Sequence, residues 1–175
     1  MKRVIFFVIA FSAMVISLGL ISCDNDTEIK DPNPFTLEKE HYTFLKNSNY
    51  YLEVQKNRSP EYSDPFEIVD VQRVDKEMHI EVSFPAGCSA NNFEIIWDGV
   101  VMESSPPQTR LFVKRTAENC NKSGEAEHRV LVIDLEEIFV KPRQGDPNLQ
   151  DAIFIVSNAS KRPDTSNADI PVTSN

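Results

Sequence analysis

The stretch EMHIEVSF, residues 77–84, alternates polar and apolar side chains without a break, and it decides the fold class. Its apolar members are Met78, Ile80, Val82 and Phe84. A period of two is typical of a β-strand with one face in a core and the other in solvent. The stretch therefore predicts a half-buried strand.

Six further segments have the composition of short strands, and turn-forming residues separate them. They are Tyr50–Val54, Phe66–Val71, Asn92–Trp97, Arg110–Lys114, His128–Ile133 and Ala152–Val156. Asp98-Gly99 is a favoured turn dipeptide, and Asp134–Phe139 indicates a helical turn capped by Asp134. Seven strands predict an all-β fold, a single antiparallel, immunoglobulin-like β-sandwich, with a closed lipocalin-like barrel as the alternative.

The composition divides the chain of 175 residues into four parts. Residues 1–22 have the layout of a secretory signal, with Lys2 and Arg3 before the uncharged run Val4–Leu20. Residues 23–40 are acidic, contain two prolines and predict a flexible tether. We expect the sandwich in residues 41–157 and a loosely held polar tail in 158–175. A transmembrane anchor is the alternative for the apolar run, which is at the short limit for a bilayer span.

Leu20-Ile21-Ser22-Cys23, at the end of that run, resembles the lipobox of bacterial lipoproteins. The resemblance implies a diacylglyceryl group on the Cys23 thiol, cleavage before Cys23 and acylation of the new amine. Several acyl chains would hold the protein on a membrane, because each buried CH₂ contributes about 0.8 kcal/mol. The acids after Cys23 resemble the Bacteroidota signal for export to the outer face of the outer membrane. In the enterobacterial scheme, Asp24 would instead imply the inner membrane, with the domain on its periplasmic face.

The net charge of −9 excludes a nucleic acid as the expected partner, because phosphate binding needs clustered Lys and Arg. Removal of residues 1–22 would take two positive charges away and leave −11. Attraction to anionic lipid is equally unexpected, so lipid on Cys23 would be the membrane attachment. We expect a soluble domain that is a monomer.

With Cys23 assigned to lipid, Cys88 and Cys120 form the one remaining pair, and an exported chain would tend to oxidise it. Closing a loop of roughly 32 residues would stabilise the fold by about 3–4 kcal/mol. A metal site or a nucleophilic cysteine is the competing interpretation, although no C-x-x-C or H-x-x-x-H spacing accompanies the cysteines.

A run of motifs around these cysteines resembles a group of small surface lipoproteins of Bacteroidota. It comprises Gly87-Cys88, Phe93–Gly99, Pro106-Pro107-Gln108, Leu111, Cys120 and Val130–Leu135, and it covers roughly residues 78–135. The resemblance implies a β-rich domain with a disulfide and implies no catalytic residue. Trp97 alternates in phase with Phe93 and Ile95, so we expect it in the core.

No motif indicates a cofactor. The chain lacks a G-x-S-x-G elbow, a phosphate-binding glycine loop and an EF-hand pattern. The alternative to a binding role is an extracytoplasmic hydrolase or metal protein with a site around His79, Glu81 and His128. His79 and Glu81 would share one face of a strand at i, i+2, which suits metal coordination if a third ligand converges.

We therefore expect a non-enzymatic binding or structural module with a protein or glycan partner. The candidate contact residues form the loop Ser104-Ser105-Pro106-Pro107-Gln108, which we expect near the disulfide. A rigid exposed loop loses less conformational entropy when it binds.

Overall fold

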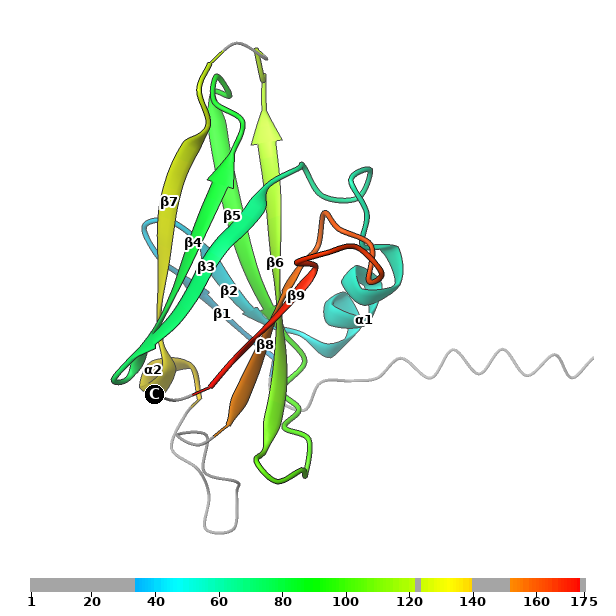
Figure 1. Cartoon of the computed structure of the whole chain (residues 1–175), viewed down its shortest axis with the longest axis vertical. Coiled ribbons are helices and arrows are strands. Elements are labelled where there is room, and N and C mark those ends of the chain that lie inside the picture. Colours follow the sequence, from blue (N-terminus) through cyan, green and yellow to red (C-terminus); the bar gives the residue numbers. More distant parts are fainter. Residues whose placement is uncertain (1–33, 122–123, 140–151, 174–175) are drawn as a thin grey trace, which may run out of the picture.

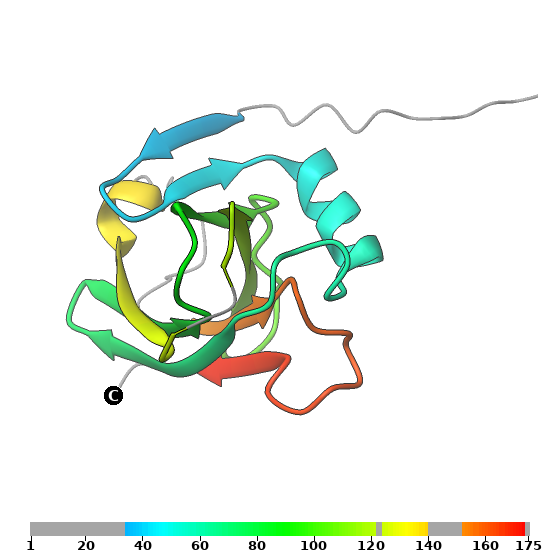
Figure 2. The same ribbon diagram turned by 90° about the horizontal axis from the view of Figure 1, so that it is seen from above.

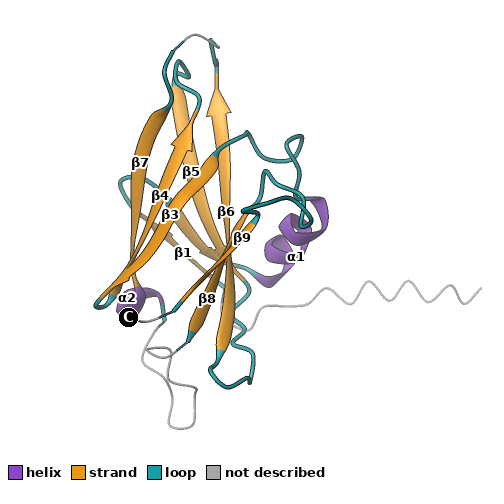
Figure 3. Ribbon diagram, viewed as in Figure 1, coloured by secondary structure: helices purple, strands orange, loops and turns teal. Residues whose placement is uncertain are grey.

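The computed structural model describes residues 34–121, 124–139 and 152–173, and strands dominate them (Figures 1 and 3). The strands are β1 (Phe35–Glu38), β2 (Thr43–Lys46), β3 (Glu67–Val74), β4 (Glu77–Phe84), β5 (Ala90–Trp97), β6 (Gln108–Glu118), β7 (Glu127–Asp134), β8 (Ile153–Asn158) and β9 (Asp169–Val172). The helices of this part of the chain are α1 (Ser48–Asn57) and α2 (Leu135–Ile138).

The strands form two sheets. One has six strands in the order β1-β2-β5-β6-β8-β9, and the other has three in the order β3-β4-β7. Figure 2 shows the two sheets facing each other across a shared interior. The all-β, sandwich-like prediction is confirmed. The closed lipocalin-like alternative is wrong, because the strand ladders of the described residues form two separate sheets.

Strand pairing is mixed, so the expectation of a purely antiparallel fold is wrong at two places. β2 runs parallel to β5, and β6 runs parallel to β8. A parallel pair needs a long crossover connection. The chain between β2 and β5 passes through α1, β3 and β4, and the chain between β6 and β8 includes β7 and α2.

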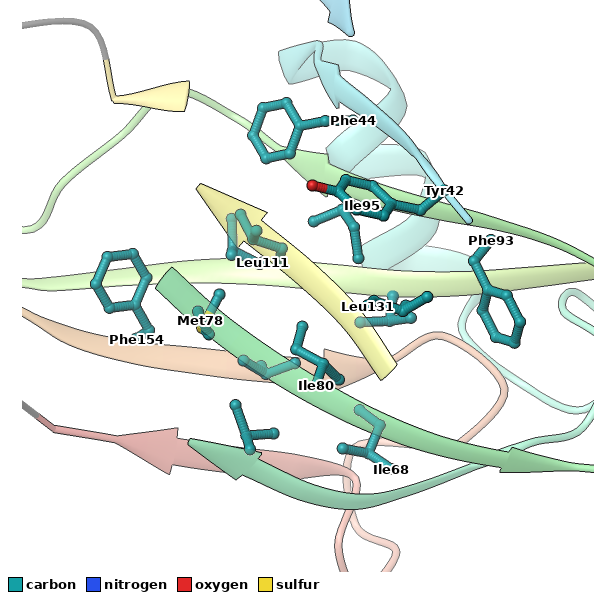
Figure 4. Packing of buried hydrophobic residues seen from close by; sticks show 14 of the residues in the cluster. Tyr42, Phe44, Ile68, Met78, Ile80, Phe93, Ile95, Leu111, Leu131 and Phe154 are labelled. Carbon is teal, nitrogen blue, oxygen red and sulfur yellow. The ribbon is translucent and has the colours of Figure 1, made fainter. Parts of the chain in front are cut away.

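The core lies between the sheets and contains the stretch that predicted the fold. All four apolar side chains of β4 are buried. They meet side chains of the large sheet such as Ile95, Leu111 and Phe154 (Figure 4). Trp97, with 7 % of its surface exposed, belongs to the same cluster, as expected.

The predicted strand Tyr50–Val54 is wrong, because these residues lie in α1. Asn47 caps the helix by accepting a hydrogen bond from the Tyr50 backbone N–H at 3.0 Å. Tyr51 and Val54, three residues apart, are the buried side chains of the helix. They pack on Ile96 and Phe112, which point to the outer face of the large sheet. Helical spacing against this second apolar face overrides the local β propensity.

The predicted tether extends too far. Residues 23–33 lie outside the described part, but Phe35–Glu38 form β1 and pair with β2. The ring of Phe35 stacks on Phe44, with centroids 5.7 Å apart, and this contact helps to fix the strand.

The predicted loose tail is also wrong. Asn158, Ala159 and Ser160 are buried, and β9 pairs with β8. The guanidinium of Arg58, 5 % exposed, donates to the Lys161 and Ala168 carbonyls at 2.9 and 3.0 Å. The polar composition of this segment predicts a loose tail, but its backbone carbonyls and the Asp169 carboxylate accept hydrogen bonds from a buried arginine.

The predicted helical turn is confirmed as α2. The Asp134 carboxylate accepts from the Glu136 and Glu137 backbone N–H groups at 2.9 and 3.1 Å. The cap turns the chain at the end of β7, beside the turn between β1 and β2, where Lys39 pairs with Glu137 at 2.6 Å (Figure 2).

Candidate functional site

The candidate contact residues lie in the connection between β5 and β6, which we call the β5–β6 loop (residues 98–107). It begins with the predicted Asp98-Gly99 turn, in which Asp98 accepts from the Val100 N–H at 2.9 Å. Gly99 has φ +83°, a backbone conformation that L side chains rarely adopt, and a Cβ here would also displace the end of the Lys46 side chain. The turn therefore requires glycine.

Hydrogen bonds brace the base of this loop. The Trp97 indole N–H donates to the Thr109 hydroxyl at 2.9 Å, and that hydroxyl donates to the Val100 carbonyl at 2.8 Å. Met102 and Gln108 bridge through their backbones, with the Met102 N–H 2.7 Å from the Gln108 carbonyl. Because Trp97 is packed in the core, the backbone at the start of the loop has a fixed position.

The tip of the loop is exposed to solvent, and a hydrogen bond within it fixes its backbone. The Ser104 hydroxyl donates to the Pro106 carbonyl at 2.7 Å, and Ser104, Ser105 and Pro106 are exposed. Pro107 is half-buried, and its carbonyl accepts from the Ile153 N–H at 2.8 Å. Gln108 is the first residue of β6. The neighbouring Val100 and Met102 expose 54 % and 45 % of their surfaces, so apolar area flanks the serines.

The disulfide Cys88–Cys120 is confirmed, but its expected closeness to the loop is wrong. Cys88 precedes β5 and Cys120 follows β6, at the end where Ala90 pairs with Glu118. The loop leaves the opposite end of the same strand pair, next to Trp97 and Leu111. Eight residues of strand separate the two ends, roughly 25 Å at about 3.3 Å per residue. Hydrogen bonds therefore brace the loop, and the disulfide fixes the far end.

The residues of the alternative hydrolase or metal site lie on the solvent face of the small sheet without converging. His128 and Glu81 meet at 3.2 Å, but His79 contacts Glu77 at 2.8 Å instead. Within the described residues, no three His, Cys, Asp or Glu side chains are grouped to hold a metal ion. His79 and His128 are thus each paired with a different carboxylate on an exposed surface.

Sequence reasoning missed a polar cluster beneath α1, because it placed Tyr50 in a strand. The Tyr50 hydroxyl donates to Glu94 at 2.7 Å and accepts from Lys114 at 2.8 Å. Burial, followed by the hydrogen bond to Glu94, raises the pKa of Tyr50 well above its ordinary value of 10. The Lys114 ammonium also lies 4.6 Å from the Tyr62 ring centroid. This cluster fastens α1 to the large sheet.

The predicted signal segment, the lipobox-like residues 20–22 and Cys23 lie outside the described residues. Among the residues that are described, none of the helices has the length and apolar character needed to cross a membrane. No protein-family model, curated protein or solved structure matches the chain. Functional inference therefore rests on the residues of this chain.

Proposed function

We propose that the chain is a lipoprotein, anchored by acyl groups on Cys23, that presents a non-enzymatic binding or structural module on the outer membrane. The resemblance of residues 20–23 to a lipobox supports the lipid anchor, and the acids that follow Cys23 support a location on the outer membrane. In this proposal the sheets act as an immunoglobulin-like scaffold and hold a contact loop at one end.

The braced, exposed β5–β6 loop is the observation that carries the binding role. Its hydrogen bonds fix the backbone before any partner arrives, so association costs little further ordering. Exposed Val100 and Met102 offer apolar contact area beside the serine hydroxyls of the tip. That mixture suits a protein or glycan surface that combines apolar patches with hydrogen-bonding groups.

A capture experiment tests the loop. The full chain is immobilised and exposed to detergent extracts of the host envelope, and V100S/M102S is compared with V69S/V74S, which alters two exposed valines of β3. We expect wild type and V69S/V74S to retain one partner and V100S/M102S to lose it at least tenfold. Equal capture by the loop variant and wild type would contradict the contact role.

Protease treatment of intact cells tests on which face of the membrane the domain lies. We expect the domain to be removed from intact cells, because the proposal places it on the outer face of the outer membrane. Removal only after the outer membrane is opened would overturn surface display and place the domain on the periplasmic side.

A further inference from the structure

The two sulfurs of the disulfide have different surroundings. Cys88 precedes β5 and Cys120 follows β6, at the end of this strand pair that is uppermost in Figure 1. Cys120 is exposed to solvent, whereas Cys88 is half-buried. One guanidinium nitrogen of Arg115 lies 3.3 Å from the Cys88 sulfur and donates a hydrogen bond to it. One sulfur is therefore open to an external reagent, and the other is in contact with a cation.

Arg115 is a buried cation without a close carboxylate. It is 2 % exposed, and its other donors go to neutral acceptors such as the Asn91 side-chain oxygen at 3.1 Å. Among the described residues it forms no ion pair, and Asp64 and Glu127 attract it only from longer range. Burial outweighs this attraction and lowers the pKa of Arg115. A buried charge without a partner is costly, so a negative charge on the Cys88 sulfur would reduce that cost.

Backbone hydrogen bonds on both sides of the disulfide join the two connections independently of the S–S bond. The Ser89 N–H donates to the Glu118 carbonyl at 2.9 Å, and the Asn121 N–H donates to the Gly87 carbonyl at 2.8 Å. We expect these bonds to keep the two sulfurs close to each other after the S–S bond opens. The bond can then form again without a search through unfolded conformations.

We propose that the disulfide is a site of reversible S-thiolation, in which a small cysteine-derived thiol attaches to Cys120 and Arg115 stabilises the released Cys88 thiolate. The thiolate of the small molecule attacks the exposed Cys120 sulfur, and its electron pair forms the new S–S bond. The original S–S bond breaks, and its electron pair stays on the Cys88 sulfur. The incoming sulfur is oxidised and Cys88 is reduced, with no proton transfer and no further oxidant. Attack of the Cys88 thiolate on the mixed disulfide reverses the step.

The direction of attack follows from the leaving group. Exchange is faster when the leaving sulfur is the more stable thiolate, and a neighbouring arginine stabilises a thiolate. Attack at Cys120 releases the sulfur beside Arg115, whereas attack at Cys88 would need access to a half-buried residue. The binding role proposed above does not use this site, so failure of either proposal leaves the other standing.

Glutathione serves as the probe for the wild-type full chain in detergent at pH 7. After acid quenching and alkylation of free thiols, peptide mass spectrometry locates the mixed disulfide. We expect glutathione on Cys120 and the alkyl group on Cys88, with an excess of about tenfold or more over the reverse product. Equal amounts of the two products, or no product until the chain is denatured, would overturn the proposal.

Two variants that each keep one cysteine of the pair test the role of Arg115. C120S leaves Cys88 beside Arg115, and C88S, the matched control, leaves Cys120 at its exposed position, while Cys23 is common to both. An ordinary cysteine is only a few per cent thiolate at pH 7. We expect the ultraviolet absorbance of the thiolate at pH 7 to be about tenfold larger for C120S than for C88S. Equal absorbance would overturn the proposal.

An arginine substitution then assigns the effect to one guanidinium. C120S/R115Q should lose the excess thiolate, and C120S/R129Q, which removes the other guanidinium near the Phe84 ring, should keep most of it. Thermal unfolding shows whether each variant is folded, and the comparison of C120S with C88S needs no arginine substitution. A folded C120S/R115Q chain that keeps the excess thiolate would contradict the role of Arg115.

Discussion

At the scale of single residues, the Arg58–Asp169 pair explains why the C-terminal segment is ordered. Arg58 donates to the Asp169 carboxylate at 3.0 Å, and Arg110 lies 3.1 Å from the same oxygen. Burial opposes ionisation of Asp169, but the hydrogen bond from Ser157 and the charges of both arginines outweigh it. The pKa of Asp169 therefore lies below its ordinary value of 3.8.

This depressed pKa makes part of the stability acid-labile. Above pH 3.8 the Asp169 carboxylate is charged in both the folded and the unfolded chain, and its interactions favour the folded chain. As the pH falls below 3.8, the carboxyl group of the unfolded chain takes up a proton first, so the free energy of unfolding decreases. We expect D169N to lower the free energy of unfolding at pH 7 by about 1–3 kcal/mol. The difference from wild type should shrink as the pH falls below 3.8.

Chemical denaturation at a series of pH values measures this effect. D164N, which alters an exposed acid of the same segment, serves as the matched control and should change little. A difference between D169N and wild type that stays constant from pH 7 to pH 3 would contradict the assignment.

At the scale of elements, strands with one buried face were predictable and α1 was not. β4 shows its period of two in the sequence because one of its faces meets the core and the other meets solvent. Residues 50–54 look equally β-like, and packing on the outer apolar face at Ile96 and Phe112 favours a helix there. That face is formed by residues distant in sequence, so local patterns could not reveal it.

The N-cap provides a test of α1 as a helix. N47A removes the side chain that accepts from the Tyr50 N–H, and we expect it to cost about 1 kcal/mol of unfolding free energy. N49A, at an exposed position within the same helix, should be neutral or slightly stabilising, because alanine favours helices. If N47A and N49A had equal effects in urea denaturation, the cap would not stabilise the fold.

At the scale of the whole molecule, the sandwich and the disulfide could be read from the sequence, while the geometry of the candidate site could not. The loop residues 104–108 and Cys88 lie near each other along the chain. Folding places them at opposite ends of the β5–β6 pair, because eight residues of strand lie between them.

The disulfide joins the connections on either side of the β5–β6 pair and closes a loop with a sequence separation of 32. We expect C88S/C120S to lower the free energy of unfolding by about 3–4 kcal/mol, because the unfolded chain regains the entropy of an open loop. Guanidinium denaturation with and without a reducing agent checks this. A reductant should destabilise wild type and leave the double variant unchanged; an unaffected wild type would show that the bridge contributes nothing.

The central claim is that Cys23 holds this β-rich module on a membrane. Metabolic labelling of producing cells with a clickable palmitate analogue, followed by mass spectrometry of the N-terminal peptide, tests it most directly. We predict label on wild type, a mature N-terminus at an acylated Cys23, and loss of both label and membrane fractionation in C23S. An unlabelled wild-type chain, or a C23S chain that carries label and stays with the membrane, would contradict the account.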